Sequence, residues 1–292
     1  MDSKEIVRAV AECTGQSISP RRVTPSGGGC INEAYVVEAD EGAFFVKFNR
    51  AERQDMFAAE QESLLAIEAT STVRVPRVFG VGCSGPHAWI VMEALPLNQR
   101  GCSAILGEQL AAMHRVEQPR FGFPNDGFIG STVQVNTPAD NWPHFFRRHR
   151  LGYQLDLARA NGASGALLGQ GEALLERVGW FFDGYDPTPS LLHGDLWGGN
   201  HAFLDDGTPV IFDPAAYCGD READLAMTEL FGGFDMDFYD AYRGAWPLDS
   251  GYRVRRDLYN LYHVLNHFNL FGGSYGSQAA RMIDRLLAEV GA

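Results

Sequence analysis

The stretch from Leu191 to Asp213 constrains the fold more than any other part of the sequence. It starts with two leucines, continues as "HGDLWGGN", a loop made tight by three glycines, and then reads "HAFLDDGTPVIFD". The last segment contains two short apolar runs around the turn "DDG", which predicts a β-hairpin over 201–213. A hairpin returns the chain to its starting point, so we expect Asn200 and Asp213 to lie side by side.

The polar residues of this stretch suit one kind of chemistry when they are taken together. The carboxylate of Asp195, in a tight loop, can accept a hydroxyl proton or orient the hydroxyl. Asn200 and Asp213 offer two oxygen ligands of the kind that Mg²⁺ prefers. Each residue alone has a plainer interpretation: Asp195 as a turn or helix cap, Asp213 as a turn initiator, and His193 as a hydrogen-bonded core histidine.

Two features upstream point to the same chemistry. "SGGGCINEAY" places Gly27, Gly28 and Gly29 just before a strand, where bare backbone N–H groups can approach a phosphate, although a flexible turn is the plainer interpretation. Lys47, in the strand "AFFVKFN", is either an edge-strand lysine that reaches solvent or a cation for phosphates. The second role needs a carboxylate partner, for which Glu60 on the following helix is the first candidate and Glu62 the alternative.

The order of these features is more informative than any one of them. A glycine turn, a strand lysine, a helix glutamate, H-x-D-x4-N, a hairpin and a strand-end aspartate follow one another. This is the phosphoryl-transfer layout of the protein-kinase type, and the Walker motif G-x4-G-K-[ST] occurs nowhere in the chain. Metal-dependent hydrolysis through His193 and Asp195 is disfavoured, because the further histidines that such a site needs do not accompany them.

Hydrophobic periodicity predicts an α+β chain with two parts. The first part should hold a helix, a hairpin, a second helix and a strand, over 3–13, 34–49, 56–70 and 87–95. The second part should be mostly helical, with helices over 104–116, 171–182 and within 222–292, and an irregular segment over 119–145. We therefore expect a small, mostly β N-lobe over 1–97 and a larger, mostly α C-lobe over 98–292.

Charge and cysteine content exclude some partners. A formal net charge of −13 disfavours nucleic acid and anionic membranes, which reward clustered Lys and Arg. The five cysteines are scattered without a C-x-x-C pair, which is typical of a reducing compartment and of neither a disulfide framework nor a zinc site. The sequence contains no signal-peptide or membrane-span pattern, so we expect a cytoplasmic protein.

The chain resembles the fructosamine kinases (ketosamine-3-kinases), within the aminoglycoside-phosphotransferase and choline-kinase-like group. "HGDLW" with a downstream "FDP" is widespread among small-molecule kinases and indicates the group only. The more particular blocks "WPHFFRRHRL" and "YCGDREADLAMTELFGGF" indicate the fructosamine kinase branch. The other matching blocks are "SGGGCINEAY", "FFVKFN", "MFAAEQESL", "FGFPNDGFIG" and "NLFGGSY".

The resemblance implies a bilobal protein-kinase-like fold, the cofactors ATP and Mg²⁺, and transfer of the γ-phosphoryl group to a ketoamine hydroxyl, the one on the third sugar carbon. The phosphorylated adduct is labile, so the glycated amine is recovered. By this resemblance Asp195 is the catalytic base, and Lys47, paired with Glu60, binds the phosphates. Asn200 and Asp213 hold the metal. Further roles fall on Glu93, Ala94 and Leu95, as a hinge that lines the adenine pocket, and on Asp224, which with His193 supports the catalytic loop.

Three residues remain as further candidates, and other functions stay open. Trp197, beside Asp195, and Trp142 are candidates for the acceptor side, although a buried tryptophan is the plainer interpretation of Trp142. Cys30 is either inert or a redox-sensitive thiol that links two chains, so we expect a monomer or a redox-linked dimer. The alternatives are a kinase for an aminoglycoside, choline or homoserine-like hydroxyl and, less favoured, a non-catalytic nucleotide-binding protein.

Overall fold

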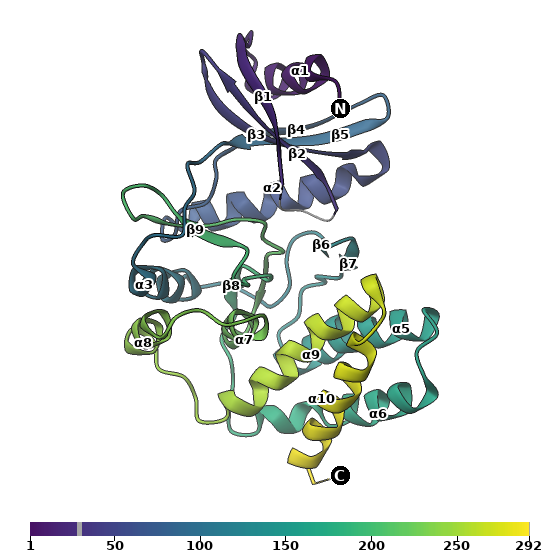
Figure 1. Cartoon of the computed structure of the whole chain (residues 1–292). Coiled ribbons are helices and arrows are strands. Elements are labelled where there is room, and N and C mark those ends of the chain that lie inside the picture. The colour runs from purple at the N-terminus through teal and green to yellow at the C-terminus, as the bar shows by residue number, and fades with distance from the viewer. Residues whose placement is uncertain (28–30, 292) are drawn as a thin grey trace. The chain divides into compact units, whose positions relative to one another are not determined.

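The computed structural model describes residues 1–27 and 31–291 (Figure 1). The chain forms two compact units, and each is described by itself. The first consists of Met1–Cys102 together with Asn200–Ala215, and the second of Ser103–Gly199 together with Ala216–Ala292. The first unit is therefore built from two separate stretches of sequence.

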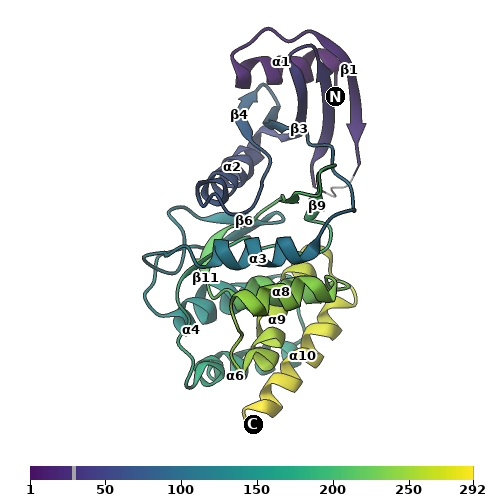
Figure 2. The same cartoon turned by 90° about the vertical axis from the view of Figure 1, so that its left-hand side faces the viewer.

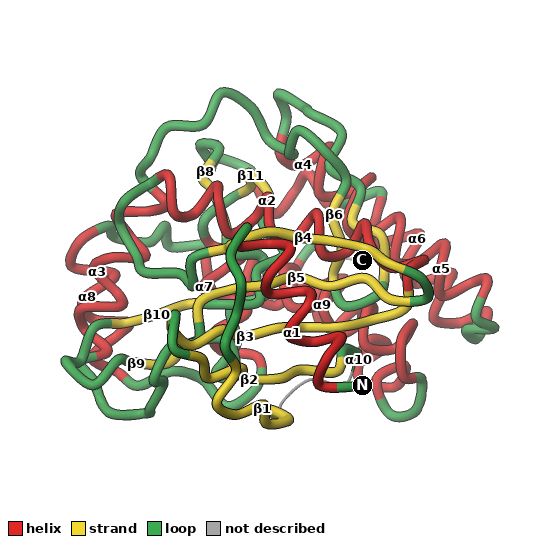
Figure 3. The backbone as a smooth tube through the Cα atoms, turned by 90° about the horizontal axis from the view of Figure 1, so that it is seen from above, coloured by secondary structure: helices red, strands yellow, loops and turns green. Residues whose placement is uncertain are grey.

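A five-stranded antiparallel sheet forms the centre of the first unit. Its strands are β1 (Pro20–Ser26), β2 (Glu33–Ala39), β3 (Gly42–Arg50), β4 (Val78–Ser84) and β5 (His87–Glu93). They lie in the order β1-β2-β3-β5-β4, which can be followed strand by strand in Figure 3. The predicted hairpin over 34–49 is confirmed as β2 and β3, with Ala39 opposite Gly42 across the turn.

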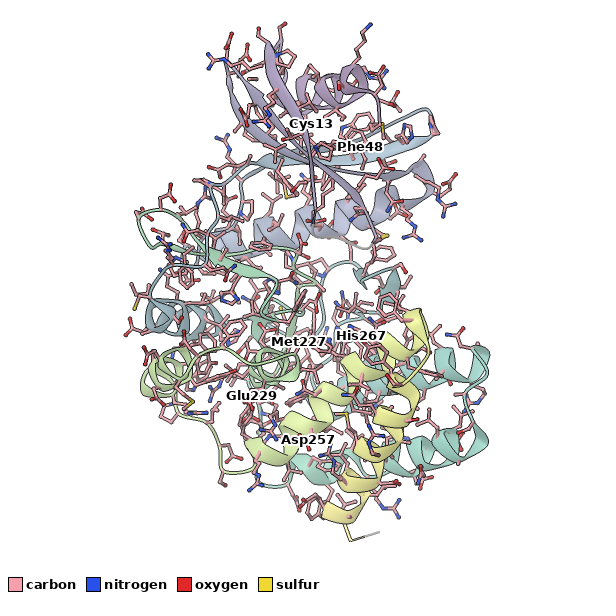
Figure 4. The ribbon with its side chains drawn as sticks, viewed as in Figure 1. Cys13, Phe48, Met227, Glu229, Asp257 and His267 are labelled. Carbon is pink, nitrogen blue, oxygen red and sulfur yellow. The ribbon has the colours of Figure 1, made fainter. Side chains whose placement is uncertain are left out.

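Two helices cover the opposite faces of this sheet. Alternate residues of a strand point to opposite faces, so neighbouring residues of β3 contact different helices. Helix α1 (Ser3–Thr14) packs on the face that carries Val46 and Phe48, and Phe48 and Cys13 are labelled in this region in Figure 4. Lys47 lies between those two residues in sequence and points to the other face, where α2 (Gln54–Ala69) lies. A short 3₁₀ helix, Ala51–Arg53, leads into α2.

A hairpin from the distant part of the sequence completes the first unit. Strands β9 (His201–Phe203) and β10 (Pro209–Ile211) pair with each other, as predicted for 201–213. Phe203 also bridges to Asn98, and Val210 bridges to Arg74. These contacts hold the hairpin on the same unit as the sheet.

The second unit is mostly helical. Its α-helices are α3 (Ser103–His114), α4 (Trp142–Phe145), α5 (Tyr153–Ala160), α6 (Gly165–Leu175), α7 (Glu222–Leu230), α8 (Met236–Ala245), α9 (Tyr252–Phe271) and α10 (Tyr275–Glu289). Helices α3 and α8 lie side by side (Figure 2). Helix α7 packs on α9, with Met227 buried in α7 and Glu229 paired with Arg256 of α9; Met227, Glu229 and Asp257 are labelled in Figure 4.

Short strands and irregular helices connect these helices. The strand pairs are β6 (Gly127–Ile129) with β7 (Thr132–Gln134), and β8 (Ser190–Leu192) with β11 (Tyr217–Gly219). A π-helix, Phe146–Gly152, lies between α4 and α5, and a 3₁₀ helix, Val178–Phe182, follows α6. Strand β8 leads directly into the loop that begins with His193, so the core of this unit anchors that loop.

The mixed α+β architecture expected from the sequence is confirmed, with the sheet in the first unit and most of the helices in the second. The predicted helices over 222–292 break at Phe231–Phe234 and at Gly272–Gly273, as their glycines indicate. Within the described residues, no helix is both long enough and apolar enough to span a bilayer.

Candidate active site

The candidate site begins with a lysine held between two carboxylates in the first unit. Lys47 of β3 donates from Nζ to Glu60 Oε1 of α2 at 2.6 Å and to Asp213 Oδ1, just beyond β10, at 2.5 Å. The side chains of Lys47 and Glu60 are 9% and 12% exposed, whereas that of Asp213 is 47% exposed. Of the two glutamates proposed as partners for Lys47, Glu60 makes this ion pair.

Charge explains why a lysine is retained in this buried position. Burial alone lowers the pKa of Lys47, but the nearby charges of Glu60 and Asp213 raise it above the ordinary value for lysine. Burial raises the pKa of Glu60, the Lys47 cation lowers it, and the Asp213 charge raises it again. Lys47 therefore remains a cation, with one buried carboxylate behind it and one more exposed carboxylate beside it.

Asn200 and Asp213 lie at the two open ends of the β9–β10 hairpin. His201 is opposite Ile211, and the Phe212 N–H donates to the Asn200 carbonyl at 3.1 Å, so the pairing brings the two residues together. Asp213 has φ 57°, a left-handed conformation that is uncommon for residues other than glycine. Such conformations persist where surrounding contacts hold them, and they concentrate at functional sites.

These residues fit a magnesium ion that is shared with a nucleotide. Mg²⁺ is usually bound through one or two protein oxygens together with substrate phosphates and water, and not by an all-protein cage. Asn200 and Asp213 supply an amide and a half-exposed carboxylate. Among the described residues, no three His, Cys, Asp or Glu side chains come close enough to hold a metal ion without such help.

Other predicted nucleotide contacts are described only in part. Gly27 is in open surroundings, where an added Cβ would meet nothing within 4 Å. Gly28, Gly29 and Cys30 lie outside the described residues. In the predicted hinge, the Glu93 N–H donates to the Arg77 carbonyl and the Ala94 N–H donates to the Ala43 carbonyl.

The side chain of Glu93 also has a partner of its own. Its carboxylate receives a hydrogen bond from the Arg74 guanidinium. Leu95 follows as the third residue of the predicted hinge, and its carbonyl accepts from the Leu97 N–H at 2.9 Å. The Glu93 side chain is thus committed to Arg74, and any contact of Glu93 with an adenine would come from its backbone.

The predicted catalytic loop lies in the second unit, and its backbone donates hydrogen bonds to Asp224 of α7. The backbone N–H groups of His193 and Gly194 donate to Asp224 Oδ2 and Oδ1 at 2.7 and 2.8 Å. The Asp195 N–H donates to His193 Nδ1 at 3.3 Å, and the ring of His193 is fully buried. Gly194 has φ 82°, so glycine is favoured at the position between the histidine and the aspartate.

The two candidate tryptophans of the second unit have different surroundings. Trp197 is 39% exposed and meets the ring of Phe231 edge-on at 6.4 Å. Trp142 is 1% exposed, and its Nε1–H donates to the Tyr259 hydroxyl at 3.0 Å. The expectation that Trp142 stacks on an acceptor is therefore wrong, because its ring is packed in the aromatic core with Phe145 and its neighbours.

The sequence did not indicate that His114 and Tyr242 are connected to the catalytic loop through Asp224. His114, at the end of α3, contacts Asp224 Oδ2 through Nε2 at 3.1 Å and the Tyr242 hydroxyl through Nδ1 at 2.8 Å. A histidine in the last turn of a helix is compatible with a simple helix-end role. Only its spacing, three and four residues after the apolar Ala111 and Leu110, could have pointed to a buried role.

Known sequences match the chain over nearly its whole length. The model of the family "Fructosamine kinase" matches residues 2–289. A Synechocystis protein named "Probable ketoamine kinase" is 44% identical over 285 residues, which cover 97% of this chain and 96% of that protein. The chloroplastic "Protein-ribulosamine 3-kinase" of Arabidopsis thaliana is 42% identical over 289 residues, covering 98% of this chain and 88% of that protein.

Solved structures agree with this match. The crystal structure of a Haemophilus somnus protein named "Putative fructosamine-3-kinase" has a TM-score of 0.87 at 30% identity, and the match covers 97% of this chain and 96% of that chain. A thermostable mutant of the aminoglycoside phosphotransferase APH(4)-Ia has a TM-score of 0.65 at 14% identity, and the match covers 98% of this chain and 99% of that chain. The second likeness, at 14% identity, concerns the fold alone.

Proposed function

Because the chain belongs to the fructosamine kinase family, we propose that it transfers the γ-phosphoryl group of ATP to a sugar hydroxyl of a ketoamine. The observation that carries the proposal is the Lys47–Glu60–Asp213 cluster beside Asn200. A cation backed by a buried carboxylate, next to two oxygen ligands, is the arrangement that phosphoryl transfer of the protein-kinase type requires.

In this proposal the first unit binds the nucleotide. Lys47 pairs with the α- and β-phosphates, and Glu60 keeps its ammonium group directed toward them. Asn200 and Asp213 hold Mg²⁺, which neutralises phosphate charge when it is bound. The carbonyl of Glu93 and the backbone of Ala94 and Leu95 line the adenine, while Gly27, Gly28 and Gly29 offer N–H groups to the phosphates.

The second unit supplies the group that acts on the acceptor. The Asp195 carboxylate accepts the hydroxyl proton as the sugar oxygen forms its bond to the γ-phosphorus. The bond from that phosphorus to the oxygen that bridges it to ADP breaks, so ADP leaves with the bonding electrons. Only four residues separate Asp195 from Asn200 in sequence, which supports joint action of the two residues on one phosphoryl group. Half-exposed Trp197, two residues after Asp195, is the proposed apolar contact for the acceptor.

The acceptor proposed is the third-carbon hydroxyl of a fructosamine or ribulosamine adduct. The names of the relatives support this choice, because they specify ketoamine and ribulosamine kinases. Phosphorylation at that carbon labilises the adduct and returns the free amine, so the reaction is a deglycation step. We further propose that the chain acts as a monomer or as a dimer linked through Cys30, and that the functional lobes are 1–97 and 98–292.

The test is ATP turnover with a panel of acceptors. Free fructosyl-lysine, ribulosyl-lysine and a ribulosylated peptide are compared with an aminoglycoside and with choline, and the position of the new phosphate is read by NMR. We expect turnover with the ketoamines only. Asp195→Asn should abolish it, whereas Asp183→Asn, the same change at an exposed loop position of the same unit, should not.

Two outcomes contradict the proposal in different ways. If Asp195→Asn matches the wild type on its best acceptor, the assignment of the base is wrong. If the panel shows turnover with choline or the aminoglycoside but with no ketoamine, the acceptor assignment is wrong while the phosphoryl-transfer chemistry stands.

A further inference from the structure

A buried polar chain connects three helices of the second unit to the catalytic loop. It runs from Arg221 Nη1 to the Tyr242 hydroxyl at 3.3 Å, from that hydroxyl to His114 Nδ1 at 2.8 Å, and from His114 Nε2 to Asp224 Oδ2 at 3.1 Å. His114 and Asp224 are each 1% exposed, and Tyr242 is fully buried. No water competes for hydrogen bonds at such depth, so each contact has a defined donor and acceptor.

The Asp224 carboxylate is shared between His114 and the catalytic loop. Oδ1 accepts from the Gly194 N–H, and Oδ2 accepts from both the His193 N–H and His114. Burial alone raises the pKa of Asp224, but the hydrogen bond with His114, the neighbouring His193 and the Gly194 N–H together bring it below its ordinary value. His114 is thus the side-chain donor that keeps this carboxylate ionised and fixes the position of Oδ2.

The partners of Tyr242 determine where the proton of His114 lies. An arginine can only donate, so the Tyr242 oxygen accepts from Arg221 and has its one hydroxyl proton left to donate. That proton goes to His114 Nδ1, the other partner of the hydroxyl. The imidazole then carries its own proton on Nε2 and donates it to Asp224. Tyr242 therefore selects the tautomer that Asp224 requires.

We propose that His114 is a positioning residue for phosphoryl transfer. It holds the Asp224 carboxylate, which holds the backbone of His193 and Gly194, and the next residue along that backbone is Asp195. The inference rests on the function proposed above for Asp195, but it concerns a residue on a different helix with no predicted contact to ATP, metal or acceptor. Tyr242 acts one step further back, through the tautomer of His114.

The experiment uses the full-length protein and four variants. His114→Leu removes both nitrogens, and His114→Gln keeps an amide donor that can reach Asp224. Tyr242→Phe removes the hydroxyl that donates to Nδ1. The matched control is Tyr185→Phe, which removes a partly buried hydroxyl that donates to a different carboxylate, Asp220 Oδ1, at 3.0 Å.

Two readouts are taken for each variant, well below its melting temperature. The first is hydrogen–deuterium exchange of peptides that cover 191–195, without any ligand. The second is kcat and the KM for ATP with the best ketoamine. In His114→Leu we expect faster exchange and a kcat lower by roughly 10-fold to 100-fold, the range typical of residues that orient a functional group by a hydrogen bond. The KM for ATP should stay near the wild-type value, because the proposed ATP contacts lie in the first unit.

The variants separate positioning from a general loss of stability. His114→Gln should recover most of the exchange protection and of kcat, and Tyr242→Phe should fall between the two His114 variants. Tyr185→Phe should leave both readouts unchanged even if it lowers the melting temperature. A merely structural role for His114 would instead make the effects follow melting temperature across all four variants, and that pattern overturns the proposal.

The test also distinguishes failure of this inference from failure of the proposed function. Unchanged exchange over 191–195 in His114→Leu overturns the inference, whether or not the protein acts on ketoamines. Faster exchange with an unchanged kcat also overturns it, because the loop would then be loosened without consequence for the reaction. Wild-type protein that is inactive on all ketoamines refutes the acceptor assignment, while exchange still decides whether His114 holds the loop.

Discussion

Replacement of Gly107 by alanine should destabilise the protein, although alanine is the better helix former. Gly107 is a buried residue in the middle of α3, where α8 packs closely. A Cβ at this position would lie 2.3 Å from the Phe238 carbonyl oxygen and 3.1 Å from the Tyr242 backbone nitrogen, both in α8. Ordinary contacts begin near 3.4 Å, so the nearer distance is short by 3.4 − 2.3 = 1.1 Å. The obstructing atoms are backbone, and no rotamer change can move them.

The magnitude follows from two opposing terms. Alanine in a helix interior is favoured over glycine by about 1 kcal/mol. Forcing extra volume into a packed core typically costs about 1–3 kcal/mol, and here one helix must move against another. Because the obstructing atoms are backbone, we take the upper part of this range, about 2–3 kcal/mol, and expect a net loss of about 1–2 kcal/mol in the free energy of unfolding. For a chain of this size that corresponds to a melting temperature lower by roughly 2–8 °C.

Gly169→Ala is the matched control. Gly169 also lies inside a helix, α6, but is exposed, and an added Cβ there would meet nothing within 4 Å. Only the helix-propensity term applies, so this variant should be stabilised by up to about 1 kcal/mol. Thermal unfolding followed by circular dichroism compares the two with wild type. A Gly107→Ala protein that melts at or above the wild-type temperature would refute the packing argument.

Two further predictions concern the metal site and the response to acid. Asp213→Asn should raise the Mg²⁺ concentration needed for half-maximal turnover and lower kcat, which a magnesium titration measures; an unchanged titration contradicts the metal assignment. The pKa of His263 is lowered to about 3, mainly by burial. The charges of His267 and Arg150 also lower it, whereas the charge of Asp224 raises it. Below pH 6.5 the unfolded state therefore binds a proton at His263, and the native state does not. The contribution of His263 to the free energy of unfolding is fully present above pH 6.5. It declines toward pH 3 by at most about 1.4 kcal/mol per pH unit. His263→Phe should flatten this part of the plot of unfolding free energy against pH, which denaturant unfolding at several pH values measures. A variant with the same slope as the wild type would contradict the prediction.

Local sequence patterns account for much of the fold. The turn after Asp40 and the "DDG" turn near Gly207 set two hairpins, and both have the pairing that the patterns predict. Strands β1 and β4 were not predicted. Strand β1, "PRRVTPS", contains two prolines and two arginines, and β4, "VFGVGCS", contains two glycines. Both lie at the edges of the sheet, where such residues are tolerated and the usual strand pattern weakens.

One part of the candidate site can be predicted from residues close together in the sequence, and another part depends on residues far apart in the sequence. The Lys47–Glu60 pair joins residues only thirteen apart on consecutive elements, so a strand followed by a helix predicts it. The contacts of His114 reach across 110 and 128 residues to α7 and α8. No periodicity in one sequence specifies which helices pack together, so this part of the site required the three-dimensional structure. The burial of Trp142 against Tyr259 has the same origin.

The division of the first unit between two stretches of sequence has a consequence for synthesis on the ribosome. Residues 1–102 emerge early, but the hairpin that bridges to Arg74 and Asn98 follows about a hundred residues later. Until it emerges, the first unit lacks the hairpin that Asn200 and Asp213 flank, and Lys47 has Glu60 as its only carboxylate partner of the two seen in the complete fold. The nascent chain therefore cannot assemble the Lys47–Glu60–Asp213 cluster before residues 103–199 of the second unit have been made. A fragment that ends at residue 102 should retain much of the sheet and yet lack the residues proposed to hold the metal.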